Sequence, residues 1–449
     1  MVSASILLAG AVAATVVSAG KPYTQESNDE FNVLRHLGGT GPWIQHTGYG
    51  LPRDPPGTCK VDQVHMIARH GERYQTTGTG ATELAVVQRL QSSGAAYVGP
   101  LAFLEDYVWP SSADTYETES VMGPYAGTLD AFRSGADYRA RYNDLYDDSA
   151  VLPVWTAGQE RVVVTARNFA AGFVGANYST KASIQVIPET SAQGANSLTV
   201  SDGCLAFNQS QYSASYNSFA DDYATRAADR INKQSPGFGV TAADVPNLMA
   251  LCGFELNIRG ADDFCKLFTT DEWKAFSYMK DLSYYYQVGQ GNNLTNYIGS
   301  VYANATATLL NQGPSVGKIF WSFTHDNDLI SIAHALGLFE TQSPLDPKNI
   351  DFGSVFRSSE IVPMGGRITM ERLTCDDDST AYVRILVNEA VIPIPACKSG
   401  PGYSCPVADF KTYINKRAPG SYGEHCGLPT TVPWHLWFFW NWTPIFSNN

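Results

Sequence analysis

Two arginines flank a histidine at the end of an apolar run. The segment QVHMIARHGERYQT covers residues 63–76 and sets Arg69, His70 and Arg73 close together. Guanidinium groups stay charged at every relevant pH and disfavour a further positive charge, so the imidazole is driven toward its neutral, nucleophilic form. A cluster of this kind is usually stable because an anion compensates it. These residues therefore point to the recognition of an anion by a site that holds a nucleophile.

Two later segments repeat this arrangement of polar residues after an apolar run. Arg161 follows the run VLPVWT at 151–156, and His325 and Asp326 follow KIFWSFT at 318–324. Loops at the carboxyl ends of parallel strands converge on one edge of a sheet, where ligands bind. We therefore expect these three residues to meet the first cluster in space.

The chemistry that suits this set is attack on a phosphate monoester. Arginines donate planar, bidentate hydrogen bonds to phosphate oxygens, and a neutral histidine can attack phosphorus. An aspartic acid can protonate the leaving oxygen if it remains protonated. Each residue also has a structural interpretation: His70 as a hydrogen-bonded loop residue, Arg161 as an ion pair on a helix surface, and Asp326 as a helix N-cap. The order and spacing of the three segments favour catalysis.

Strand patterns that lead into helical patterns must position these residues. This alternation predicts an α/β fold with a mostly parallel central sheet flanked by helices, and a smaller, mainly helical inserted domain. The expected strands are 61–68, 151–156, 183–188 and 318–324, and helices are expected at about 82–90, 161–173 and 328–339. The expected α/β domain comprises 20–79, 146–207 and 311–449, and the expected inserted domain comprises 80–145 and 208–310.

Several features predict export. Residues 1–19 are small and apolar and end in a small-x-small pattern, which favours a secretory signal peptide over a membrane anchor. Eight cysteines, an even number, suit four disulfides, which the sequence alone leaves unpaired. No cysteine or histidine spacing indicates a metal. Glycosylation sequons stand at Asn177, Asn208, Asn293, Asn304 and Asn441. The sequence therefore predicts a secreted, disulfide-bonded glycoprotein.

The overall charge argues against several classes of partner. A formal net charge of −13 and a pI of about 5.0 make general attraction to nucleic acid or to an acidic membrane surface unfavourable. The aromatic tail at 433–446 is too short to span a bilayer, so we expect it to cover the core, with a carbohydrate or partner site as the alternative. The sequence leaves a homo-oligomer open.

The motifs resemble those of the fungal histidine acid phosphatases, the family of yeast secreted acid phosphatases and fungal phytases. RHGER, ERVVVTARNF and FTHDNDL are similar to its three active-site segments, and the likeness extends over nearly all of the chain after residue 19. The filamentous-fungal acid phosphatases of very low pH optimum, also called phytase B, are the most similar subgroup. The resemblance implies that phosphate monoesters, including phytate, are the substrates.

The resemblance also implies residue roles. His70 would form a phosphohistidine, Asp326 would protonate the departing alcohol, and water would then attack the intermediate. The phosphoryl oxygens would be held by Arg69, Arg73, Arg161 and His325, and no metal or other cofactor is implied. The implied disulfides are Cys59–Cys375, Cys204–Cys426, Cys252–Cys265 and Cys397–Cys405.

Two positions carry separate hypotheses. Gln75 stands where the family usually has proline, so we expect a looser turn behind the site and weaker stability or turnover. Glu272 is similar to an acidic substrate-wall position of the low-pH subgroup, and a carboxylate there would repel highly charged phytate except at acid pH.

The sequence therefore predicts a secreted acid phosphatase of broad specificity that also accepts phytate at acid pH. A dedicated 3-phytase is the alternative. A phosphotransferase similar to phosphoglycerate mutase and a catalytically silent secreted glycoprotein are less favoured, because the signal segment argues against the first and the intact nucleophile, arginines and acid argue against the second.

Overall fold

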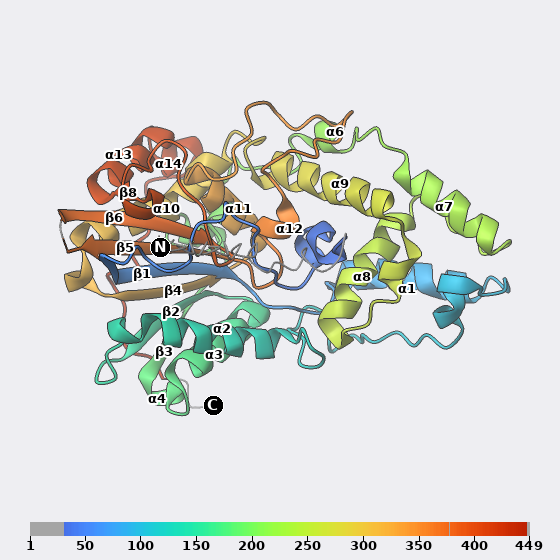
Figure 1. Cartoon of the computed structure of the whole chain (residues 1–449), viewed down its shortest axis with the longest axis horizontal. Coiled ribbons are helices and arrows are strands. Elements are labelled where there is room, and N and C mark those ends of the chain that lie inside the picture. The colour runs from blue at the N-terminus through green and yellow to red at the C-terminus, as the bar shows by residue number, and fades with distance from the viewer. Residues whose placement is uncertain (1–30, 377, 447–449) are drawn as a thin grey trace, which may run out of the picture. The chain divides into compact units, whose positions relative to one another are not determined.

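Four parallel strands form one half of an eight-stranded sheet (Figure 1). The computed structural model describes residues 31–376 and 378–446, and the account below concerns the unit formed by residues 33–449. The parallel strands lie in the order β3–β2–β4–β1, with β3 at the edge of the sheet. Their bounds are Cys59–Arg69 for β1, Leu152–Ala157 for β2, Ala182–Ile187 for β3 and Ile319–Thr324 for β4. Each coincides with an expected strand, because apolar runs buried on both faces suit a parallel sheet.

The other half of the sheet is antiparallel and was not predicted from the sequence. Strand β5 pairs antiparallel with β1, and β6 pairs with β5, β7 and β8. These strands span Arg367–Cys375 (β5), Asp378–Val387 (β6), Ala390–Val391 (β7) and Cys405–Pro406 (β8). Charged residues interrupt their apolar pattern, and the structure shows that these charges are buried in ion pairs. The fold is therefore the expected α/β class, with an antiparallel extension of its parallel core.

Helices cover both faces of the sheet (Figure 1). On one face, α2 (Gly127–Tyr142) packs on α3 (Glu160–Val174). On the other face, α10 (Thr295–Gln312) packs against α11 (Asp326–Ala335) and α13 (Val407–Arg417). Helices α2 and α10 fall within the segments expected to form the inserted domain, yet both pack against helices that cover the sheet. The division into two domains stays a prediction.

A second group of helices lies beyond the carboxyl ends of the parallel strands (Figure 1). It contains α1 (Thr77–Gln91), α7 (Tyr223–Gln234), α8 (Val245–Arg259) and α9 (Thr270–Val288). Helix α1 begins earlier than expected because the Thr76 side chain caps it by accepting from the Thr79 backbone N–H. The short helices are α4 (Tyr178–Lys181), α5 (Val200–Gly203), α6 (Ser213–Tyr216), α12 (Ser358–Ile361) and α14 (Tyr422–His425).

Four disulfides cross-link the chain, and the aromatic tail packs against the core. The four disulfides join Cys59 with Cys375, Cys204 with Cys426, Cys252 with Cys265 and Cys397 with Cys405, which are the pairs implied by the resemblance. In the tail, Phe438 and Phe439 are buried, and the Phe439 ring lies 4.8 Å from Trp155 and 5.6 Å from Phe320 between centroids. The tail therefore covers the core, as expected.

The expected signal peptide at 1–19 lies outside the described residues. Within the described part of the chain, none of the helices is long and apolar enough to cross a membrane. Four sequon asparagines, Asn177, Asn208, Asn293 and Asn441, are exposed, whereas Asn304 lies partly buried on α10.

Candidate active site

Two of the three candidate segments meet where β1 and β4 end side by side. In the parallel register Arg69 lies opposite Thr324, and the His70 backbone N–H donates to the Thr324 carbonyl at 3.0 Å. This pairing places the RHGER loop next to His325, and the ring centroids of His70 and His325 are 5.8 Å apart. The convergence expected from strand order is therefore present at this edge of the sheet.

The environment of His70 keeps its imidazole neutral. The side chain is 1% exposed, and its pKa lies well below the ordinary value because of burial and the positive charges of nearby groups, which are Arg69, Arg73, Arg161 and His325. Its Nδ1 lies 2.8 Å from the Gly71 carbonyl oxygen, which can only accept, so Nδ1 carries the proton. The Nε2 atom therefore keeps its lone pair, as a nucleophile requires.

Three arginines surround this imidazole with incompletely used hydrogen-bond donors. Arg69 donates from Nη1 to the carbonyls of Gly39 at 2.6 Å and Val362 at 2.7 Å, which fixes its orientation. Arg73 donates from Nη1 to the Tyr74 carbonyl at 2.7 Å, and Arg161 lies 3.7 Å from Glu117. Each of the three leaves a buried Nε–H without a partner among the described residues.

Burial and mutual repulsion lower the pKa values of two arginines in this site, Arg73 and Arg161. Burial, followed by the charges of Arg69 and Arg161, lowers the pKa of Arg73 to about 9. Burial also lowers the pKa of Arg161, and the nearby Glu117 only partly offsets this. Desolvated cations that lack full carboxylate partners are costly, so the arrangement favours binding of an anion.

Asp326 begins α11 and is ionised in the ligand-free site. Its Oδ2 lies 2.9 Å from Arg69 Nη2 and accepts from the Tyr284 hydroxyl at 2.7 Å. Burial opposes ionisation, but the Arg69 charge and the Tyr284 hydrogen bond outweigh it and hold the pKa of Asp326 at about 2. A Cβ atom on Gly39 would lie 2.1 Å from the Tyr284 hydroxyl oxygen, so glycine is required for this close approach.

Glu189 is a site residue that the sequence reasoning missed. Its carboxylate lies 3.2 Å from His325 Nε2 and accepts from the Gln159 backbone N–H at 2.7 Å. His325 and Gln159 precede Asp326 and Arg161 closely in the chain, so one carboxylate links both loops. The position of Glu189, directly after the parallel strand β3, was a usable signal, since such positions reach the same edge of the sheet.

Buried carboxyl groups support the catalytic loop from behind, and they too were missed. Glu119 accepts from the Gly71 backbone N–H at 3.2 Å and from the Thr165 hydroxyl. Glu72 accepts from the Trp43 backbone N–H at 2.7 Å. Burial raises the pKa of both glutamates to about 8, and in each carboxyl group one oxygen has no partner among the described residues.

Gln75 anchors the turn behind the site. The side chain is fully buried, donates to Glu83 at 3.1 Å and accepts from the Ser111 hydroxyl at 2.9 Å. The hypothesis of a looser turn considered only the backbone freedom gained when proline is absent. The structure shows two side-chain hydrogen bonds that proline could not make, and these offset that freedom.

Glu272, the residue expected to act as an acidic gate, is buried on α9, and that role stays a prediction. It closes a capping box at the start of α9, accepting from the Thr269 backbone N–H at 2.8 Å, and pairs with Arg230 at 2.6 Å. Tyr284, which does reach Asp326, lies further along the same helix by about 18 Å at 1.5 Å per residue. Glu272 therefore acts as a buried helix cap.

The geometry agrees with comparisons to known proteins. Residues 60–388 match the histidine phosphatase superfamily (branch 2). The chain belongs to this family. The acid phosphatase PHO1 of Komagataella pastoris is 42% identical over 94% of this chain and 92% of its own length, and the phytase PHO112 of Candida albicans is 38% identical over 94% and 93%. The crystal structure of the phytase from D. castellii superposes with a TM-score of 0.89 at 36% identity, covering 98% of both chains. The protein is accordingly a phosphatase of the acid phosphatase and phytase type.

Proposed function

We propose that this histidine phosphatase is a secreted acid phosphatase that hydrolyses phosphate monoesters through a phosphohistidine at His70. The observation that carries the proposal is the neutral imidazole of His70 among three arginines that leave buried N–H donors unpartnered. A phosphate group supplies the acceptors and the negative charge that these arginines lack. Arg69, Arg73, Arg161 and His325 hold its oxygens.

In the first step, His70 Nε2 attacks phosphorus as the ester P–O bond breaks. Asp326 gives its proton to the departing alkoxide, so an alcohol leaves and a phosphohistidine remains. The Asp326 carboxylate is ionised in the free site because Arg69 and Tyr284 stabilise it. A bound phosphate takes up the charge of Arg69 and repels the carboxylate, which raises its proton affinity. Protonation at acid pH then prepares it as the donor.

In the second step, water attacks the phosphohistidine. The Asp326 carboxylate left by the first step accepts a proton from this water, the P–N bond breaks, and inorganic phosphate leaves with His70 neutral again. The buried donors of the three arginines stabilise charge on the phosphoryl oxygens in both steps, because their orientation is set before the substrate arrives.

The proposed substrate range is broad and includes phytate at acid pH. The names of two relatives, the phytases of C. albicans and D. castellii, support this range. A dedicated 3-phytase is the alternative. Export by a signal peptide at 1–19 belongs to the same proposal.

The test is phosphate release by the purified secreted protein between pH 2 and 7, from p-nitrophenyl phosphate and from phytate, with His70→Ala in parallel. We expect release at acid pH from both substrates, loss of release in the variant, and an acid-labile phosphoryl label on the wild-type protein alone. Equal release by wild type and variant would overturn the role of His70. Release from phytate alone would favour the 3-phytase, and transfer to an alcohol without free phosphate would favour a phosphotransferase.

A further inference from the structure

A groove far from the catalytic loop lies between α10 and the C-terminal tail. We call it the tail groove. It encloses about 230 Å³ and is lined by side chains from three places: α10, the start of α14 and the tail. Its lining includes Asn304 from α10 and Trp434, His435 and Trp440 from the tail.

Asn304 is the sequon asparagine that lines this groove. It lies in the middle of α10, is partly buried, and makes no side-chain hydrogen bond within the described part of the chain. The hydroxyl residue of its sequon, Thr306, is fully buried and donates to the carbonyls of Tyr302 and Ala303. The Asn304 amide is therefore the sequon group that reaches open space, and that space is the groove.

The opposite wall contains one exposed tryptophan, Trp440, and one partly exposed tryptophan, Trp434, whose ring packs on Gly423. Trp440 is 43% exposed although it lines the groove, whereas its neighbours Phe438 and Phe439 are buried in the core. Trp434 is partly buried, and His435 beside it is exposed. A concave site with indole rings and a few polar groups suits a ligand that has both apolar and hydroxyl-bearing faces. A pyranose sugar has that character.

We propose that an N-linked glycan on Asn304 occupies the tail groove, with its first N-acetylglucosamine packed against Trp434 and Trp440. The linkage forms when Asn304 Nδ2 displaces the diphosphate of a lipid-linked oligosaccharide. The N–C1 bond replaces the C1–O bond, and the lipid diphosphate leaves with one proton. The sugar thereby fastens the tail to α10. This inference rests on the secretion that forms part of the proposed function.

The order of synthesis makes this placement feasible. The sequon is buried at Ala305 and Thr306 in the folded chain, so the sugar must be attached before α10 packs. Asn304 precedes the tail in the sequence, so the aromatic wall can fold onto a sugar that is already in place. The glycan then fills a groove that would otherwise leave an indole face in water.

Site occupancy and protection from a glycosidase test the inference. The full chain is secreted from a fungal host, and glycopeptides are quantified at Asn304 and at the exposed Asn177. The native protein is then treated with an endoglycosidase that cleaves the glycan core. We expect both sites to be occupied, the Asn304 glycan to be cleaved about tenfold or more slowly than the Asn177 glycan, and Trp440→Ala to remove that difference, since cleavage in the groove requires local opening.

The outcomes separate this inference from the proposal of secretion. Occupied Asn177 with bare Asn304, or equal cleavage rates at the two sites, would overturn the groove glycan and leave secretion intact. Secreted protein without sugar at any sequon would overturn the groove glycan alone, whereas failure of export would overturn both. As a second readout, Asn304→Gln should lower the thermal midpoint by about 2 °C. The control Asn177→Gln should leave it unchanged, and an equal effect of the two variants would contradict the inference.

Discussion

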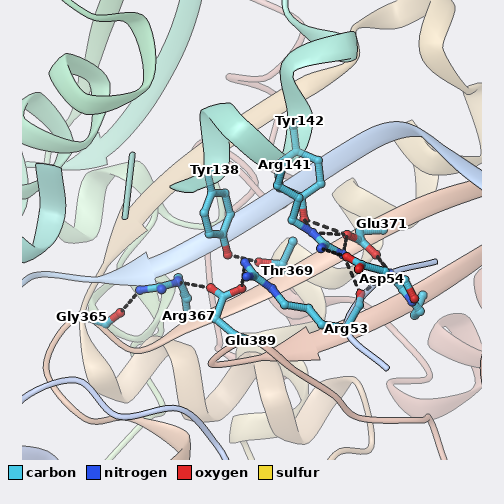
Figure 2. Close-up of polar contacts among 11 residues, drawn as sticks. Arg53, Asp54, Tyr138, Arg141, Tyr142, Gly365, Arg367, Thr369, Glu371 and Glu389 are labelled. Atoms are coloured by element: carbon cyan, nitrogen blue, oxygen red, sulfur yellow. Dashed lines mark hydrogen bonds and ion pairs between the residues drawn. The ribbon is translucent and has the colours of Figure 1, made fainter. Parts of the chain in front are cut away.

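Two groups of buried arginines in this protein have opposite surroundings. The phosphate-site arginines, Arg69, Arg73 and Arg161, retain buried donors without partners. The second group, here called the paired cluster, lies between α2 and strands β5 and β6 (Figure 2). It consists of Arg141, Arg367 and Arg384 with the carboxylates of Glu371 and Glu389. Arg53, which is 39% exposed, pairs with Glu389 at its edge. Arg367, for example, donates from Nε to Glu389 at 2.7 Å, and Arg141 from Nη2 to Glu371 at 2.8 Å.

The pKa values of the two groups move in opposite directions. Burial alone lowers the pKa of a guanidinium. In the paired cluster the Glu371 and Glu389 charges outweigh burial, so the pKa values of Arg141 and Arg367 are raised. At the catalytic loop burial prevails, and the pKa values of Arg73 and Arg161 are lowered. Arginine content alone therefore does not mark a site; the balance between burial and the charge of nearby carboxylates does.

Removal of a phosphate-site arginine should have the largest effect on catalysis. We expect Arg73→Met to reduce kcat/KM for p-nitrophenyl phosphate by about 10³-fold or more, as for other arginines that stabilise a transferring phosphoryl group. The free energy of unfolding should stay the same or rise, because an incompletely paired buried cation is removed. Initial rates at acid pH and urea unfolding measure the two effects. If Arg73→Met instead lost much stability but kept full activity when folded, the distinction between the phosphate-site arginines and the paired cluster would be wrong.

Removal of an arginine from the paired cluster should show the reverse pattern. Arg367→Met leaves the Glu389 carboxylate with Arg53 as its remaining ionic partner, so we expect a loss of about 3 kcal/mol in the free energy of unfolding. The kcat per folded molecule should change little. The double variant Arg367→Met with Glu389→Gln should recover part of the stability because no buried carboxylate is left incompletely paired. Arg53, which loses Glu389, is 39% exposed and can be solvated. A drop in kcat/KM without a change in urea unfolding would contradict the assignment.

The same contrast explains what the sequence could predict. The sequence could predict that Arg69, His70, Arg161, His325 and Asp326 lie at one edge of the sheet. Each stands at or just after the end of an apolar run that becomes a parallel strand, and local sequence encodes such positions. Strand β5 was missed because its charged residues make an irregular pattern that only their distant partners explain. The ion pair of Glu272 with Arg230 was not predicted, because resemblance at one position says nothing about a nearby arginine.

The two regions should also respond differently to rising pH. Burial raises the pKa of Glu119, behind the catalytic loop, to about 8, whereas the pKa of Glu389 in the paired cluster is lowered because Arg367 and Arg53 outweigh burial. Below pH 4.5, the pKa in the unfolded chain, Glu119 is protonated in both states and the folded protein keeps its full stability. As the pH rises toward 8, Glu119 ionises more readily in the unfolded chain than in the folded one, so the free energy of unfolding falls. Between pH 4.5 and pH 8, Glu119 alone should lower the free energy of unfolding by about 4 kcal/mol.

Urea unfolding of wild type and Glu119→Gln at pH 4.5 and pH 8 measures this contribution. We expect the wild type to lose stability between the two pH values and the variant to lose less, because glutamine cannot ionise. Glu424→Gln is a matched control, since that glutamate caps α14 in an exposed position away from the catalytic loop. Equal losses in wild type and Glu119→Gln would show that Glu119 is not the group that titrates.

The smallest expected effect concerns Glu189, the carboxylate nearest to His325. Unlike the carboxylates of the paired cluster, it contacts a histidine and a backbone N–H, so we propose that it orients the phosphate site. Glu189→Gln keeps an oxygen acceptor for the Gln159 N–H but loses the charge toward His325. We expect KM for p-nitrophenyl phosphate to rise about tenfold with a smaller change in kcat, the signature of lost positioning in substrate binding. Glu189→Asp, which keeps the charge on a shorter side chain, should recover part of the loss. If kcat falls while KM stays constant, Glu189 acts in the chemical step. In that case Glu189 does not serve only to orient the groups that bind the anion.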